Sequence, residues 1–181
     1  MGAFVLAPMV LIGMFGFSIS AAAGIMLLRT FSFTITSPVG GWLGGRVGER
    51  TAAVLGEGTM TVALVVMVFG LFEGSLAAFS TGLALQGVGL GVAAPSLTSS
   101  ISNAVPDKDL GIASAANGLL SQSGSAFGIT LLTLVYGGVN TGSGLGRAFA
   151  VGALLAALSL VAASFMRPTD GRTEHDPSGI A

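Results

Sequence analysis

Long stretches without any charged residue most constrain how this chain can fold. These stretches cover residues 1–28, 74–106, 110–146 and 148–166. A helix needs about 20 mainly apolar residues to cross the hydrocarbon core of a bilayer. Apolar residues run continuously through the stretches, whereas they would alternate with polar ones in the strands of a membrane barrel. We therefore predict an all-α membrane protein, because a helix satisfies its backbone hydrogen bonds within one segment.

Turn residues divide the apolar sequence into about six transmembrane helices, which form one helical domain over residues 1–166. The predicted helices cover residues 3–15, 20–45, 51–72, 76–103, 110–137 and 147–166. Short connections rich in Gly, Pro, Asn, Asp and Ser separate them, so consecutive helices are antiparallel. The first helix is too short for a full crossing. We therefore expect it to be truncated, and the sequence leaves open whether Met1 is a true start.

The distribution of basic residues predicts the orientation. Residues 167–181 are polar and contain two prolines and two glycines, which predicts a disordered tail. Alternate connections collect Arg46, Arg50, Lys108 and this tail on one side, against Arg147 on the other. Basic residues near helix ends stay cytoplasmic. We expect a multi-pass protein of the plasma (inner) membrane with both termini in the cytoplasm.

Composition excludes several other classes of protein. The sequence has no cysteine and a net charge of −1, so we expect neither a disulfide framework nor a nucleic-acid partner. The single histidine, His175, lies in the polar tail, and one histidine is no metal site. The sequence contains no paired nucleophile and base, no carboxylate dyad and no phosphate-binding loop. We therefore expect no enzyme activity, no metal and no cofactor.

A basic, glycine-rich segment joins the second and third predicted helices. It resembles the signature loop of the major facilitator superfamily, Gly-x-Leu-Ala-Asp-Arg-x-Gly-Arg-Arg. The matching residues are Gly41, Leu43, Arg46, Gly48 and Arg50. Gly45 stands where the family usually has Asp, so the acid of the family's gating salt bridge is missing, and Glu49 stands where a basic residue is common. The resemblance implies half of a major-facilitator fold, with this segment as its gating loop.

Three further segments resemble the C-terminal half of drug:proton antiporters of the fourteen-helix branch. They cover residues 86–95, 111–118 and 121–128. The resemblance implies the C-terminal six-helix half of a proton-coupled efflux permease for small, hydrophobic molecules, which works by alternating access between two halves. The partners that it implies are the lipid bilayer, a small-molecule substrate, protons and a missing N-terminal half. Because this chain has few intramembrane acids, we expect the main proton-binding carboxylate in that other half.

Glycines spaced four residues apart predict close contacts between helices. The pairs Gly87 and Gly91, and Gly124 and Gly128, have this spacing within apolar spans. Helices in lipid approach closely only where small residues face each other. We therefore interpret these glycines as helix-packing sites.

Charged groups inside the spans are candidates for the substrate path or for coupling to protons. Arg29 shares a helical face with Ser32 and Thr36, which indicates a protein-lined cavity, although snorkelling or an ion pair would also explain it. Glu57 is the one acid clearly inside a span. It is a candidate protonation site, and the alternative is that it is hydrated or pairs with Arg46 or Arg50.

Polar uncharged side chains in the fourth and fifth helices are further candidates for the substrate path. They are Gln86, Asn117, Ser121 and Gln122. The alternative is that they fasten helices together by hydrogen bonds. Two other functions stay open from the residues: a small membrane scaffold or regulatory protein, in which Arg29→Ala changes assembly but no solute flux, and a homodimeric half-transporter made of two copies.

Overall fold

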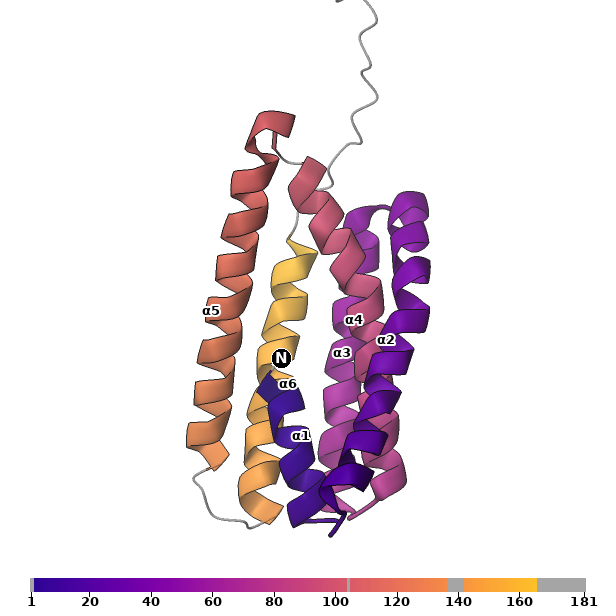
Figure 1. Cartoon of the computed structure of the whole chain (residues 1–181), viewed down its shortest axis with the longest axis vertical. Coiled ribbons are helices and arrows are strands. Elements are labelled where there is room, and N and C mark those ends of the chain that lie inside the picture. The colour runs from indigo at the N-terminus through magenta and orange to yellow at the C-terminus, as the bar shows by residue number, and fades with distance from the viewer. Residues whose placement is uncertain (1, 104, 137–141, 166–181) are drawn as a thin grey trace, which may run out of the picture.

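The computed structural model describes residues 2–103, 105–136 and 142–165, and within them it consists of helices joined by short turns (Figure 1). Its helices are α1 (Gly2–Gly13), α2 (Ile19–Val47), α3 (Glu49–Phe72), α4 (Leu76–Asn103), the short 3-10 helix η1 (Asp107–Asp109), α5 (Leu110–Tyr136) and α6 (Gly142–Ser164). This bundle confirms the predicted all-α fold class. The predicted tail, with His175, lies outside the described residues.

Among the described residues, five helices are long and apolar enough to cross a membrane, and α1 is shorter. Consecutive helices run antiparallel (Figure 1). The turn between α2 and α3, the connection between α4 and α5, and the end of α6 therefore lie at one end of the bundle, the top in Figure 1. Arg46, Arg50 and Lys108 belong to this end, which we call the basic end, and Arg147 belongs to α6 near the opposite end.

The turn between α2 and α3 is shorter than the sequence suggested. The predicted helices ended at residue 45 and began again at residue 51, whereas α2 continues to Val47 and α3 begins at Glu49, so Gly48 is the single residue between them. Gly48 has φ 89°, a conformation that residues with a Cβ rarely adopt. The preceding glycines stay helical because Gly44 is buried in a helix contact, where an added Cβ would lie 2.9 Å from Ser96 Oγ of α4.

Helix α6 also begins earlier than predicted, at Gly142 and not at residue 147. The prediction took the glycines before Arg147 as a turn. Glycine costs only about 1 kcal/mol relative to alanine within a helix, and Leu145 in this first part of α6 is buried in the core. Its burial stabilises the additional helical residues.

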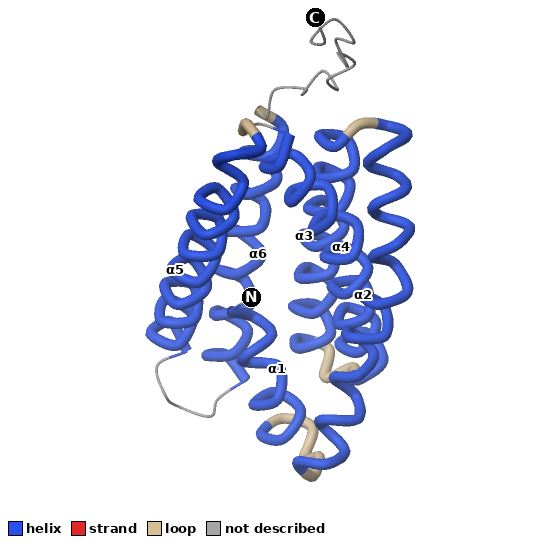
Figure 2. The backbone as a smooth tube through the Cα atoms, turned by 45° about the horizontal axis from the view of Figure 1, so that its top comes forward, coloured by secondary structure: helices blue, strands red, loops and turns tan. Residues whose placement is uncertain are grey.

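Helix α4 packs against both α2 and α3, and α6 packs on α3 (Figure 2). The glycines of α4 allow α2 and α3 to approach it closely. An added Cβ at Gly91 would lie 3.0 Å from the Phe33 carbonyl oxygen of α2, and one at Gly89 would lie 2.7 Å from the Gly56 carbonyl oxygen of α3. Small residues on two faces of α4 therefore let it pack closely between α2 and α3.

A buried apolar cluster lies toward the end of the bundle opposite the basic end, and it contains residues of α1, α3, α4, α5 and α6. The short helix α1 contributes Leu6, Ala7, Val10 and Leu11 to it. Phe79 of α4 is fully buried, with its ring centroid 6.0 Å from that of Phe15 and 5.9 Å from that of Phe149 in α6. Aromatic contacts of this geometry contribute beyond the area that they bury, so these rings fasten α4 to α6 and to the connection after α1.

Candidate functional site

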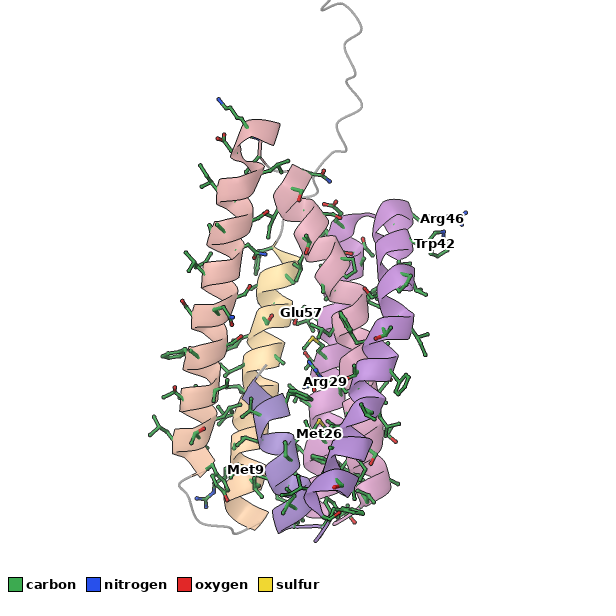
Figure 3. The ribbon with its side chains drawn as sticks, viewed as in Figure 1. Met9, Met26, Arg29, Trp42, Arg46 and Glu57 are labelled. Carbon is green, nitrogen blue, oxygen red and sulfur yellow. The ribbon has the colours of Figure 1, made fainter. Side chains whose placement is uncertain are left out.

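Arg29 and Gln86 meet at the contact between α2 and α4. The Nε of Arg29 donates a hydrogen bond to Oε1 of Gln86 at 3.1 Å. Gln86 is almost fully buried, at 3% exposed, whereas Arg29 is half-buried. The guanidinium carbon of Arg29 also lies 4.1 Å from the ring centroid of Phe4 in α1. Three helices thus hold one cation within the membrane-spanning part of the bundle, where Figure 3 shows Arg29 directed to the middle of the molecule.

Ser32 and Thr36 lie on the same face of α2 and contact the glycines of α4. A Cβ added at Gly87 would lie 2.9 Å from Ser32 Cβ, and one at Gly91 would lie 3.0 Å from Thr36 Cβ. The Thr36 hydroxyl donates to the Ser32 carbonyl oxygen within α2 at 2.6 Å. The polar face of α2 is therefore also its packing face. The Thr36 hydroxyl bonds within its own helix, and Arg29 is the group of this face whose hydrogen bond reaches α4.

Glu57 joins α3 to α6. Its Oε2 accepts a hydrogen bond from Ser159 Oγ at 3.1 Å, and its carbonyl oxygen accepts one from Thr61 Oγ1 of the next turn. The side chain is half-buried. The partner of Glu57 is thus a neutral hydroxyl, and both Arg46 and Arg50 are engaged elsewhere.

The residues that match the signature loop, for which a gating role was expected, lie at the basic end. Arg46 is exposed and stacks on Trp42, with 4.6 Å between its guanidinium carbon and the ring centroid (Figure 3). Arg50 donates from Nη2 to the Ser164 carbonyl oxygen at the end of α6. A Cβ added at Gly41 would lie 3.9 Å from Pro95 Cβ, an ordinary contact distance, and Leu43 is half-buried. The hydrogen bond of Arg50 thus links the start of α3 to the end of α6.

Glu49 is a functional candidate that sequence reasoning missed. Its carboxylate accepts one hydrogen bond from Ser100 Oγ and another from Asn103 Nδ2, both at 2.8 Å. The available signal was an acid in the first turn of a helix, where the helix dipole favours negative charge. Glu49 and Arg50 also line a pocket of about 420 Å³, together with Val47, Gly48, Thr51, Val54, Leu55 and Ser164.

The candidates on α5 stand apart from this group. Figures 1 and 2 both show α5 and α2 at opposite edges of the bundle. Ser121 and Gln122 are exposed, and Asn117 is half-buried without a hydrogen bond to any described residue. A Cβ added at Gly124 or Gly128 would have nothing within 4 Å. The structure thus brings Arg29 and Gln86 together and leaves the polar and small residues of α5 uncovered.

The described residues hold no group of three or more His, Cys, Asp or Glu side chains suited to a metal ion. What they do hold is a cation within the spans, a carboxylate between two helices, and a network of hydrogen bonds at the basic end. Such groups suit the binding of a solute and the linking of one helix to another. A charged side chain within the membrane is costly unless it is paired, so charges kept there usually have a function.

Comparison with known proteins gives a family for this fold. The model of the Major Facilitator Superfamily matches residues 1–181. The multidrug transporter protein MdtP of Bacillus subtilis is 26% identical over 179 residues, which are 99% of this chain and 32% of that protein.

Two mycobacterial proteins are also similar. A triacylglyceride transporter of Mycolicibacterium smegmatis is 32% identical over 132 residues, or 66% of this chain and 23% of that protein. A triacylglyceride transporter of Mycobacterium tuberculosis is 29% identical over 125 residues, or 62% of this chain and 24% of that protein. The chain thus spans about a third or less of the length of these relatives.

Proposed function

The chain belongs to the Major Facilitator Superfamily, and from this premise we propose that it forms the C-terminal six-helix half of a proton-coupled efflux permease. The substrate is a small hydrophobic molecule. Two six-helix halves alternately expose it to the two sides of the membrane.

The observation that carries this proposal is the Arg29–Gln86 contact between two membrane-spanning helices. A permanently charged guanidinium at membrane depth is costly, and its place between α2, α4 and α1 suits a group that meets a solute inside the bundle. The names of the relatives support an apolar substrate, since one is a multidrug transporter and others are triacylglyceride transporters.

The proposed second half covers the helices that this chain leaves open. Five large apolar side chains of α5 are each more than 70% exposed, namely Ile112, Leu119, Leu120, Phe127 and Leu134. Gly124 and Gly128 lie on the same helix with free space beside them. Small residues without a neighbour suit close contact with another helix. We assign that contact to an N-terminal half, and a second copy of this chain is the alternative.

Protons drive the export in this proposal, and the main proton-binding carboxylate belongs to the other half. Glu57 supports this division, because its carboxylate accepts a hydrogen bond from Ser159 of α6 and belongs to α3, whereas Arg29 and Gln86 belong to α2 and α4. The orientation follows the positive-inside rule, with the basic end of the bundle and both chain termini in the cytoplasm of a plasma-membrane protein.

Two measurements test the function. The first adds a tag to the C-terminus of the protein at its native gene and measures the size of the product by immunoblot. A product more than twice 17.9 kDa agrees with a two-half permease, and one near 17.9 kDa favours the homodimer or the scaffold.

The second compares cells that lack the gene with wild type for accumulation of the neutral dye Nile red. We expect cells without the gene to accumulate more dye than wild type. A protonophore is expected to abolish this difference between the two strains. A difference that persists with the protonophore contradicts proton coupling.

A further inference from the structure

Arg29 has a positive charge without a described negative partner. Its hydrogen bond goes to the neutral amide of Gln86, and its aromatic contact goes to Phe4. No carboxylate among the described residues forms an ion pair with it. The guanidinium keeps its charge in proteins, so this position in the spans requires a negative group from outside the described structure.

The position of Arg29 along α2 makes that requirement strong. It lies ten residues after Ile19, the first residue of α2, or about 15 Å along the helix axis. The helix has 29 residues, so Arg29 is far from both of its ends. Snorkelling to a headgroup works best for basic residues near helix ends, and both contacts of Arg29 instead hold the side chain against α4 and α1.

The same contacts leave the binding edge of the guanidinium available. Arginine has five N–H donors, of which Nε has one and the two Nη groups have four. Gln86 takes the Nε proton, and Phe4 covers the flat face of the group. The two Nη groups form the edge that binds a carboxylate or a phosphate through two parallel hydrogen bonds. Arg29 is half-buried, so part of its side chain is accessible to a ligand.

Besides Gln86, Arg29 has two apolar neighbours. Phe4 lies on one side, and Met26, one turn earlier on the same face of α2, lies beside it in Figure 3. Methionine side chains adjust to irregular apolar ligands. An anion-binding edge next to such residues matches a molecule with one acidic group and an apolar body.

We propose that Arg29 is a substrate-binding residue whose Nη groups bind the acidic head of an amphipathic solute, either a carboxylate or a phosphate. Gln86 is a positioning residue, because it fixes the Nε side of the guanidinium. Phe4 supports the flat face. This inference rests on the proposed transport function and deepens it: the permease carries neutral hydrophobic molecules as well, and Arg29 gives additional affinity for those with a negative charge.

The test uses two probes that differ in one charge, dansyl-labelled undecanoic acid and its methyl ester. The full-length protein, expressed from its native gene and purified in amphipol, is titrated with each probe while dansyl emission is recorded. We expect Arg29→Gln to weaken binding of the acid about ten- to hundredfold, the range for a lost charge-assisted hydrogen bond, and to change binding of the ester less than about twofold.

Three other variants complete the experiment. Arg29→Lys retains the charge without the planar edge, so its affinity for the acid is expected between wild type and Arg29→Gln. Gln86→Leu weakens acid binding and spares the ester. Arg147→Gln, which removes an exposed arginine of α6, is expected to leave both affinities at the wild-type level. If Arg29→Gln does not give a monodisperse protein, Arg29→Lys and Gln86→Leu decide the question.

The outcomes separate this inference from the transport function. Equal loss of acid and ester binding in Arg29→Gln overturns the anion site, and it indicates that Arg29 pairs with a carboxylate of the other half. Unchanged binding of both probes also overturns it. A wild-type protein that binds neither probe contradicts the proposed permease itself, together with the inference that rests on it.

Discussion

The side-chain amide of Asn103, the last residue of α4, donates a hydrogen bond to the carboxylate of Glu49, the first residue of α3, at 2.8 Å. The other carboxylate oxygen accepts from Ser100 one turn earlier. The next residue, Arg50, donates to the end of α6. Two adjacent side chains at the start of α3 thus fix the basic ends of two neighbouring helices. Any movement of α3 at this end must move α4 and α6 or break these bonds.

Glu49→Ala is predicted to lower the free energy of unfolding by about 1–2 kcal/mol, because two hydrogen bonds to a charged group are lost at a half-buried site. Thermal unfolding of the purified protein measures the effect. Glu73→Ala is the matched control, since Glu73 is an exposed acid at the opposite end of α3. A double-mutant cycle with Asn103→Ala is expected to show coupling, and additive effects of the two substitutions would contradict the contact.

Gly56→Ala is predicted to disrupt the contact between α3 and α4. The new Cβ would lie 2.6 Å from the Ala93 backbone nitrogen, and backbone atoms cannot move aside as a flexible side chain can. Overpacking of this kind costs about 1–3 kcal/mol. The control is Gly58→Ala on the same helix, where the nearest atom is Leu160 Cδ1 at 3.9 Å. Melting temperatures of the two variants give the comparison, and equal values for both would refute the prediction.

Glu57→Gln is predicted to keep proton-driven export within about twofold of wild type, because an amide oxygen can still accept the hydrogen bond from Ser159. Glu57→Leu removes the bond and is expected to lower the melting temperature. Dye export from energised cells, measured at several external pH values, tests coupling separately from stability. If Glu57→Gln exports no dye although the protein reaches the membrane, Glu57 itself is the coupling carboxylate.

Gly124→Leu is predicted to abolish export while the membrane level of the protein stays normal. The new leucine side chain meets no described atom of this chain near its Cβ. The effect of the substitution on export should therefore arise from the proposed contact with the other half. Gly118→Leu, on a different face of α5 and equally free of neighbours, is the control. Export is measured with the same dye, and normal export by Gly124→Leu would show that this face receives no helix.

The candidate site shows how far sequence reasoning extends. Arg29 and Gln86 are recognisable as polar residues within apolar spans, yet their hydrogen bond joins residues 57 positions apart. For Glu57 the sequence offered water or an arginine of the loop as its partner. Its described partner is Ser159, because α6 folds back onto α3. Serine is so common in these helices that no spacing rule identifies the pair.

Glycine spacing has the same limitation. Gly87 and Gly91 have the four-residue spacing of close helix contacts and lie against α2, whereas Gly124 and Gly128 have the same spacing and no neighbour in the described structure. Spacing places two glycines on one face of a helix. It contains no information on which helix lies opposite that face.

The sequence by itself determined the class of this protein, its spans and its family resemblance, because the length of an apolar run is set by bilayer thickness and short turns force antiparallel neighbours. The tertiary structure decided which helices touch: α4 between α2 and α3, Arg29 on Gln86, and Glu49 on Ser100 and Asn103. These contacts depend on the rotation of each helix about its axis and on how closely its small residues let a neighbour approach. The rotation of each α-helix and the closeness of each contact depend on the packing of all the helices at once.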